Sequence, residues 1–514
     1  MIEIFLDHSD QEVKIKQISR KQSFKTVTTS RWSLPLILLF QAVVSWLLLQ
    51  NTAFQDEALY VYAGRQIVQH WLGAPAILDN YSFYFSGNPY VYPIIGGTLD
   101  MIGGLELARF FSLVCMLIVT TCGYYVTKRL FDEKSAIFAA IFFVCQAPVL
   151  FLSRLATYDP LCICLLALGA AIAIKTSYAK RPWIALLIGP TLVLSFFTKY
   201  AALLFIPSII ALLLLVTWIR LGWRATFVRG TLAIVSLILS AALALFIVIH
   251  YNPSMFHALT ATTTDRQTEY VYARLSLVEN ILQLTGVSFL LGMMSLLFAR
   301  KKDLLVALLL LGSALLVPAY HVYKAELISL AKHLGFSMFF VMPVAGCVLA
   351  RLSGFRQRIS SYGRYLFSGL AICLMLFLFL TPQATFMYQS WPPTNDLTHA
   401  LKTLVRQGNG HYLAEQYEVS RYNLENETYN WQWVGLQFFQ YTDKQGNYYF
   451  GNPAYVKAIN DGYFDVIQLN YGYNAPTADV VANAIIQSHK YDLIEKIPYT
   501  DAYGTGYFWI WRLH

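Results

Sequence analysis

Charged residues are scarce in this chain. Only 13% of its 514 residues are Asp, Glu, Lys or Arg, whereas 57% are hydrophobic and 15% are aromatic. In soluble globular proteins about a quarter of the residues are charged. Together with a mean hydropathy of +0.48, this shortage excludes an ordinary soluble protein and predicts a polytopic α-helical membrane protein.

Cysteine is missing from the polar end of the chain. No cysteine follows Cys373, so the C-terminal region can hold no disulfide framework. All seven cysteines lie inside apolar runs, where we interpret them as small buried hydrophobic side chains. The segment before the first apolar run also lacks the layout of a cleaved signal peptide, so we expect the first helix to be a retained anchor.

Several short motifs of well-known enzyme classes are absent. The sequence contains no HExxH, no CxxC pair, no Walker phosphate loop and no dinucleotide-binding glycine fingerprint. Metalloprotease, redox, ATPase and nicotinamide-dependent functions are therefore excluded for want of residues. We predict neither a metal site nor a bound cofactor.

About eleven apolar segments approach the length of a membrane-spanning helix, which needs about 20 apolar residues. They lie near residues 33–50, 105–127, 135–152, 160–175, 183–198, 201–219, 230–250, 281–299, 303–320, 335–350 and 365–384. With eleven crossings the basic clusters fall on alternate loops, which the positive-inside rule makes cytoplasmic. The net charge of +9 is therefore explained by topology, and no nucleic-acid partner is predicted.

This topology predicts three parts of the chain. Residues 1–32 form a cytoplasmic N-terminal tail, and residues 33–385 form a transmembrane domain with a long first external loop, residues 51–104. Residues 386–514 form an extracytoplasmic domain. We therefore expect a multi-pass protein of the cell membrane whose N-terminus is cytoplasmic and whose C-terminal domain lies outside.

The C-terminal part has ordinary polarity and, at roughly 120 residues, is large enough to bury a core of its own as a small α/β domain. We expect helices near 395–407 and 478–489 and closing strands near 492–497 and 506–513. The aromatic stretch Tyr429–Trp433 would suit carbohydrate stacking or the domain core. We favour the core, because aromatic residues dominate core burial.

The first external loop is long for a connector, and loops of this length are usually functional. Within it, Ala58 to Leu72 has the pattern of an amphipathic helix that is suited to lying in the membrane interface. The alternative is a connector that only covers the helix bundle.

Three carboxylates are candidates for chemistry. Asp56 and Glu57 follow the first apolar segment, where an acid beside a low-dielectric wall can accept a proton as a general base. The alternative is a hydrated acid at the interface. Asp159 precedes Pro160 at the start of a later helix, where it is either functional or an N-cap residue.

Several cations lie on the same predicted side of the membrane. Lys199 interrupts an apolar stretch, where it would be a phosphate ligand or a lysine that snorkels from a helix end. Others occur in two later external loops and would bind an anion or anchor the interface. They are Arg266, Arg274, Lys324, Lys332 and His333.

These motifs, in this order, resemble the GT-C glycosyltransferases. The closest branch is the group of protein O-mannosyltransferases, aminoarabinose transferase and dolichyl-phosphate-mannose-dependent enzymes. The resemblance covers roughly the first 350 residues. The segments that carry it are Phe54–Tyr60, Leu107–Ser112, Lys128–Phe131, Arg154–Leu161, Phe196–Tyr200 and Lys332–Pro343.

The resemblance implies a membrane enzyme that takes a sugar from a polyprenyl phosphate, whose lipid tail lies between helices. Asp56 would be the base that activates an acceptor hydroxyl, and Glu57, Asp159 and Tyr60 would orient donor or acceptor. A single base without a covalent intermediate implies inversion at the anomeric carbon. The acceptor, a glycan, a lipid or a protein of the cell envelope, is left open.

The resemblance also implies a site for the donor phosphate. Lys199, Lys332, His333 and Arg266 would hold this group and stabilise its charge as it leaves, so that the reaction requires neither nucleotide nor metal. A flippase or transporter of lipid-linked glycans is the alternative from another class. The acids cluster at one face and no inverted repeat is visible, which favours the enzyme. A ligase or polymerase of surface polysaccharide is a nearer alternative.

Overall fold

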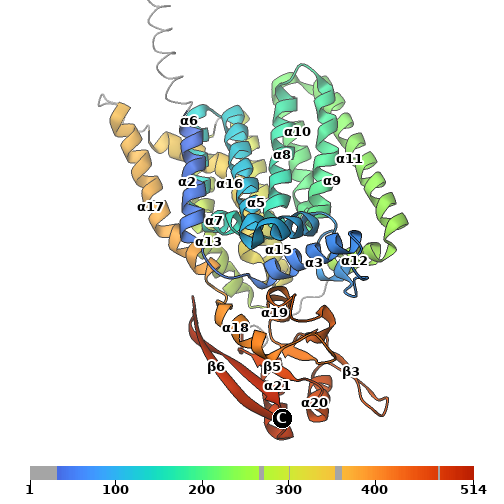
Figure 1. The fold of residues 1–514 in the computed structure, drawn as a ribbon. Helices are drawn as coiled ribbons and strands as arrows, with labels where there is room; N and C mark the ends of the chain where they lie inside the picture. Colours follow the sequence, from blue (N-terminus) through green and yellow to red (C-terminus); the bar gives the residue numbers. More distant parts are fainter. Residues whose placement is uncertain (1–31, 265–270, 300, 354–361, 473–474) are drawn as a thin grey trace, which may run out of the picture. The chain divides into compact units, whose positions relative to one another are not determined.

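The computed structural model describes residues 32–264, 271–299, 301–353, 362–472 and 475–514 (Figure 1). These residues belong to two compact units. The first, which we call the helical unit, contains residues 32–47, 113–153 and 159–384. The second, the mixed unit, contains residues 48–112, 154–158 and 385–514. The mixed unit therefore groups residues 51–104, which we predicted to be the first external loop, with the C-terminal region.

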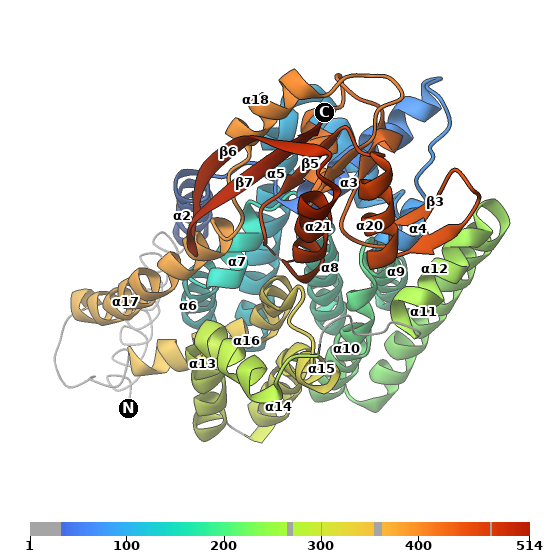
Figure 2. The same ribbon diagram turned by 90° about the horizontal axis from the view of Figure 1, so that it is seen from below.

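The helical unit is built around α16, Leu330–Leu352, which is buried over almost its whole length. Helices α6, α13 and α14 pack against it, while α9 and α10 pack against α11 (Figures 1 and 2). The described helices of this unit are α2 Ser33–Leu48, α5 Tyr92–Leu130, α6 Glu133–Val144, α7 Ala147–Ser153, α8 Tyr158–Tyr178, η1 Pro182–Leu187, α9 Ile188–Thr198, η2 Tyr200–Leu204, α10 Ile206–Leu221, α11 Trp223–Tyr251, α12 Pro253–Thr263, α13 Arg274–Phe298, α14 Lys301–Ala314, α15 Leu316–Lys324, α16 and α17 Tyr362–Tyr388. Four of them, α2, α5, α8 and α17, extend into the mixed unit.

The described helices confirm a multi-pass membrane protein but not the count of eleven spans. Seven of them are long and apolar enough to cross a membrane, or eight if the bent pair α6 and α7 forms one span. The predicted span 135–152 is this pair, whose halves meet at 71°. The apolar helices Ser33–Leu48 and Pro182–Thr198 are shorter than 18 residues. Hydropathy detects an apolar run but neither a bend within it nor the exact end of a helix, which explains the difference for these three predicted spans.

The C-terminal region of the mixed unit contains a five-stranded sheet in the order β2-β1-β5-β7-β6. Strand β1 runs parallel to β2 and β5. Strand β7 is antiparallel to β5 and β6, and Figure 2 shows it between them. The strands β3 and β4 form a separate antiparallel pair. The bounds are β1 Tyr412–Ala414, β2 Trp433–Val434, β3 Gln440–Thr442, β4 Tyr448–Phe450, β5 Val466–Leu469, β6 Tyr491–Asp501 and β7 Gly504–Leu513.

Both faces of this sheet are covered, because alternate side chains of a strand point to opposite faces. Ile467 of β5 packs in one core with α20, Asn452–Asp461, and α21, Ala475–Ser488. Its neighbour Val466 packs in a second core with α18, Asn395–Leu404. The predicted C-terminal α/β region is therefore confirmed.

The first external loop contains α3, Gln55–Trp71, the single turn α4, Tyr81–Tyr84, and the start of α5. Helix α5 is interrupted at Gly103 and Gly104, where the backbone leaves the helical conformation and Gly104 has a φ of 71°. Such a conformation is open to glycine at little cost. The residues before this break lie in the mixed unit with α3.

Two glycines let α3 and α5 cross in contact. A Cβ atom on Gly64 would lie 1.7 Å from the carbonyl oxygen of Pro93, and one on Gly97 would lie 2.4 Å from the backbone nitrogen of Arg65. Both obstacles are backbone atoms, which cannot rotate away. The crossing fixes α3, and with it Asp56 and Glu57 in the first turn of that helix.

We predict that Gly64→Ala lowers the free energy of unfolding by about 1–3 kcal/mol, because overpacking forces the two backbones apart. Thermal unfolding of the purified protein in detergent measures the effect. Gly312→Ala in α14 is the control, since no atom lies within 4 Å of its added Cβ, and alanine favours a helix. Equal unfolding temperatures for Gly64→Ala and the wild type would contradict the prediction.

Candidate active site

The carboxylate of Glu57 is the most enclosed group of the α3 N-terminus, with no exposed surface. Its Oε1 accepts hydrogen bonds from Arg109 Nε at 2.9 Å and from the Ala156 backbone at 2.8 Å. Its Oε2 accepts from Arg109 Nη2 at 2.7 Å and from the Phe54 backbone at 3.0 Å. Four donors therefore occupy this carboxylate, and they join α3, α5 and the segment 154–158.

Arg109 extends this network to the turn before α3. Its Nη1 donates to the carbonyl of Asn51 at 2.8 Å, and its Nη2 donates to the carbonyl of Thr52 at 3.0 Å. Glu106 pairs with Arg109 at 3.1 Å and also with Arg154. A guanidinium that is 1% exposed is retained in such a position only when its donors are satisfied. The network therefore holds residues 51–57 in one conformation.

Asp56 differs from Glu57 in its exposure, since its side chain is only half-buried. It lies in the first turn of α3, where the helix dipole favours a negative charge. Tyr60, one turn further on, is buried and stacks on Tyr158 with ring centroids 4.5 Å apart. Of the two adjacent acids, Asp56 is thus the one with exposed surface for a substrate.

Asp159 and Lys199 form a buried ion pair in the helical unit. Lys199 Nζ lies 2.6 Å from Asp159 Oδ1, and the two side chains are 3% and 0% exposed. Lys199 occupies the break between α9 and η2. Its ammonium group points inward rather than snorkelling to the surface, and an anion that reached it would share it with Asp159.

His333 and Lys332 begin α16, and Lys332 is buried. The Nδ1 of His333 lies 2.9 Å from Nε2 of His321, whose Nδ1 lies 2.7 Å from the carbonyl oxygen of Glu326. Lys324 and Arg274 lie at the end of α15 and the start of α13. Arg266, the fourth residue assigned to the donor phosphate, lies outside the described residues.

The candidate residues thus fall into two groups. Asp56, Glu57 and Tyr60 belong to the mixed unit. Asp159, Lys199, Lys332 and His333 belong to the helical unit, and within it Asp159 and Lys199 are brought together.

Sequence reasoning missed the helix that lies along α3. Helix α19, Tyr417–Asn423, comes from the C-terminal region and packs against α3. Glu418 accepts a hydrogen bond from Gln55 at the start of α3. The two helices therefore bury part of the polar face that was expected to lie in the membrane interface.

The contacts continue along the helix pair. Arg421 stacks on Tyr62 at 4.9 Å. Just after α19, Glu425 pairs with Arg65 and accepts a hydrogen bond from Gln69 at 3.3 Å.

Sequence reasoning also missed the role of Arg109 as the partner of Glu57. The sequence did contain a signal for it, because a charged residue inside an apolar segment is a functional or structural candidate.

The aromatic stretch of the C-terminal region is divided between core and surface. Trp433 is 5% exposed and packs in the core with α18. Tyr429 and Trp431 are 46% and 41% exposed and stack on each other with an interplanar angle of 13°. The core interpretation therefore holds for Trp433 and not for the two exposed rings.

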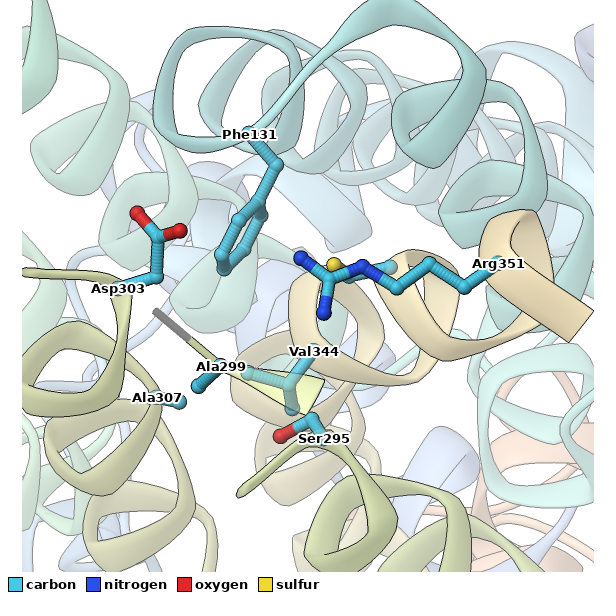
Figure 3. Close-up of a pocket in the computed structure, with 8 residues that line it drawn as sticks. Phe131, Ser295, Ala299, Asp303, Ala307, Val344 and Arg351 are labelled. Atoms are coloured by element: carbon cyan, nitrogen blue, oxygen red, sulfur yellow. The ribbon is translucent and has the colours of Figure 1, made fainter. Parts of the chain in front are cut away.

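A small pocket lies at the other end of α16 from His333. It is lined by residues of α13, α14 and α16, and Figure 3 shows Phe131 between Asp303 and Arg351. At 1.5 Å per residue, Arg351 lies roughly 30 Å along α16 from Lys332. The pocket is therefore separate from the candidate residues of the helical unit.

Residues 89–246 match the family model of dolichyl-phosphate-mannose-protein mannosyltransferases. No curated protein matches the chain by sequence. Among solved structures, ArnT from Cupriavidus metallidurans in the apo state matches with a TM-score of 0.61 and 12% identity, over 94% of this chain and 98% of ArnT. The chain therefore has a GT-C fold.

Two further structures share this GT-C fold. ArnT bound to undecaprenyl phosphate has a TM-score of 0.61 and 12% identity, over 93% of this chain and 97% of ArnT. AglB, an oligosaccharyltransferase from Archaeoglobus fulgidus, in complex with an inhibitory peptide and a dolichol-phosphate, has a TM-score of 0.56 and 13% identity. That match covers 93% of this chain and 74% of AglB. The predicted fold class is confirmed.

We predict that Glu57→Gln lowers the free energy of unfolding by about 3–5 kcal/mol, because the buried Arg109 guanidinium loses its buried counter-charge. Among the described residues it keeps only the pair with Glu106, whose side chain is 51% exposed. The unfolding temperature of the purified protein measures this loss. Glu427→Gln is the control, because it removes an ion pair with Lys402, whose side chain is 60% exposed. This variant should lower the free energy of unfolding by less than about 1 kcal/mol. Losses of equal size in the two variants would show that the Glu57 network is not the stabilising element.

Proposed function

We propose that this protein is an inverting glycosyltransferase that moves a sugar from a polyprenyl phosphate to an acceptor hydroxyl. The observation that carries the proposal is Asp56, a half-buried carboxylate held at the N-terminus of α3 by the Glu57 and Arg109 network. The GT-C fold and the match over residues 89–246 support it. The matched family and AglB are transferases by name, which favours transfer over the transport of lipid-linked glycans.

In this reaction the acceptor oxygen attacks the anomeric carbon of the donor in line with the bond to phosphate. The carbon–oxygen bond to phosphate breaks as the new bond forms, and Asp56 accepts the proton of the hydroxyl. One displacement inverts the configuration, because retention needs a second one. Glu57 acts by holding Asp56, since its own oxygens are occupied by four donors.

The donor phosphate would bind to the cations of the helical unit and of the loop before α13. Lys199, Lys332, His333 and Arg266 are the assigned ligands, and fixed cations stabilise the charge of the leaving phosphate without a metal ion. Bound undecaprenyl phosphate in ArnT and dolichol-phosphate in AglB support a polyprenyl-phosphate partner. We further propose that the N-terminus is cytoplasmic and that transfer occurs on the opposite face of the membrane, as the basic loops indicate.

Asp56→Asn should reduce sugar transfer about a hundredfold or more, because the general base is lost while the shape of the side chain is kept. Membranes with equal amounts of the wild type and the variant are supplied with a panel of labelled polyprenyl-phosphate sugars, and the transferred label is counted.

Asp492→Asn is the matched control for this experiment. Asp492 is 71% exposed on β6, so its loss should leave transfer unchanged. Equal turnover by Asp56→Asn and the wild type would remove Asp56 from the mechanism. A wild type that uses no donor of the panel would overturn the proposed reaction.

The double variant Asp159→Asn/Lys199→Met tests the phosphate site without leaving a buried charge unpaired. We expect its KM for the donor to rise about tenfold or more over that of Asp159→Asn alone, since a hydrogen bond to a charged group is lost. Initial rates at several donor concentrations give this value. The same KM in both variants would remove Lys199 from the phosphate site.

A further inference from the structure

His321 and His333 form a hydrogen-bonded pair where α15 and α16 pack together. The Nε2 atom of His321 lies 2.9 Å from the Nδ1 atom of His333, and the ring centroids are 5.1 Å apart. The other nitrogen of His321, Nδ1, lies 2.7 Å from the backbone carbonyl oxygen of Glu326. His321 has no exposed surface. Two hydrogen bonds therefore run in series from this carbonyl through His321 to His333.

The carbonyl of Glu326 decides which nitrogen of His321 carries a proton. A carbonyl oxygen can only accept a hydrogen bond, so Nδ1 of His321 must hold the proton that it donates. A second proton on Nε2 would make His321 a cation, which a site without exposed surface disfavours. Its Nε2 is therefore the acceptor, and the proton between the two rings belongs to Nδ1 of His333.

This assignment leaves one nitrogen of His333 for an anionic ligand. A neutral imidazole has a single N–H group, and in His333 that group donates to His321. The oxygen of an ionised phosphate only accepts hydrogen bonds, so it can bind at Nε2 only after Nε2 has gained a proton. His333 therefore has to be an imidazolium, with two N–H groups, when it holds a phosphate.

The loop between the two helices holds the Glu326 carbonyl in place. Ala325, directly after α15, has a φ of 53°, and Ser329, directly before α16, has a φ of 62°. Residues with a Cβ atom adopt this left-handed conformation only where the surrounding contacts hold it. Here the backbone of Glu326 donates to the carbonyl of His321 at 3.1 Å, and that of Tyr272 donates to the carbonyl of Ala325 at 2.9 Å. The acceptor of His321 is thus fixed from both sides.

His333 also lies beside a row of packed rings that leads to Lys199. Its ring contacts Phe336, three residues further along α16, with centroids 6.4 Å apart. Phe336 stacks on Phe205, which follows η2, with centroids 5.8 Å apart. Helix η2 begins directly after Lys199. Two of the residues assigned to the donor phosphate are therefore joined through rings of the helical unit.

The charged residues around the histidine pair are mostly cations. Those described in the last turn of α15, the loop after it, the first turns of α16 and α13 and the break before η2, with its ion-pair partner, are Lys324, Glu326, Lys332, Arg274, Lys199 and Asp159. The acids among them are Glu326 and Asp159, and Asp159 is paired with Lys199. Neighbouring cations disfavour a further positive charge, whereas a bound anion favours it. Protonation of His333 is therefore tied to the arrival of a phosphate.

We propose that His321 is a positioning residue that sets the tautomer of His333, so that His333 takes up one proton as it binds the donor phosphate. The inference rests on the proposed function, in which His333 is a ligand of that phosphate. The proton comes from the solvent and forms the Nε2–H bond, while Nδ1–H stays with His321. The imidazolium then stabilises the charge on the leaving phosphate as the sugar is transferred.

The test is the nitrogen NMR spectrum of the full-length protein in detergent at neutral pH, with isotope-labelled histidine. The chemical shift of a ring nitrogen distinguishes an N–H group from a lone pair, and His333→Gln identifies the signals of His333. Without ligand, His333 should have N–H at Nδ1 and a lone pair at Nε2. After a polyprenyl phosphate is added, its Nε2 should become N–H. The corresponding polyprenol, which lacks the phosphate, should leave the spectrum unchanged.

Two variants of His321 separate positioning from packing, with the dissociation constant of labelled polyprenyl phosphate as the readout. In His321→Gln the side-chain oxygen can still accept from Nδ1 of His333, so the affinity should stay unchanged. His321→Phe keeps a ring but has no acceptor, so the affinity should fall about tenfold, as for a lost hydrogen bond to a charged group. A role in packing alone would give the opposite order. His399→Asn, at an exposed histidine of α18, is the control and should bind as the wild type does.

The outcomes separate the inference from the proposed function, because the spectra and the binding measurement need no turnover. If the wild type transfers sugar but Nε2 of His333 carries a proton before the phosphate is added, or does not respond to it, the inference is overturned and the transferase remains. A greater loss of affinity in His321→Gln than in His321→Phe overturns it as well. If no sugar is transferred and Nε2 still gains a proton with the phosphate, the proposed function fails while the role of the pair stands. The wild-type spectra decide the question if the His321 variants do not accumulate.

Discussion

The ion pair between Glu57 and Arg109 is the contact on which the candidate site depends. It is buried on both sides and joins residues that are 52 positions apart in the chain. Through its further hydrogen bonds, the pair orders the turn before α3, the start of that helix and the segment 154–158. Removing one partner of such a pair lowers the free energy of unfolding by more than the intact pair adds to it, because the remaining charge stays buried. This asymmetry makes the network a strong restraint on the neighbouring Asp56.

The helical unit contains a second pair of the same kind, Asp159 and Lys199. It lies where α9 ends and the chain turns into η2, so the pair ties this break to the first turn of α8. Lys199 is therefore both a structural cation and the assigned phosphate ligand. A cation with a fixed partner is oriented before any anion arrives, which is the condition for electrostatic stabilisation without reorganisation.

The sequence was sufficient for the fold class and for the adjacent acids at the start of α3, because hydropathy and short motifs are local signals. Residue patterns alone did not distinguish Asp56 from Glu57, and only the resemblance assigned the base to Asp56. The difference in their surroundings is made by Arg109, which is distant in the chain. It also missed Glu418, whose place beside α3 follows from how the C-terminal region folds. The apolar run 135–152 was visible, but the 71° bend within it was not.

The C-terminal region and residues 48–112 belong to one compact unit, so they have to be exchanged together in engineering. The ion pair between Arg65 and Glu425 spans 360 positions, and the pair Arg421 with Asp79 spans 342. A chimera that exchanges only residues 385–514 would strip α3 of its partners and leave buried charges uncompensated. The exchangeable module of this protein is therefore discontinuous, and a graft has to carry both segments to keep a folded site.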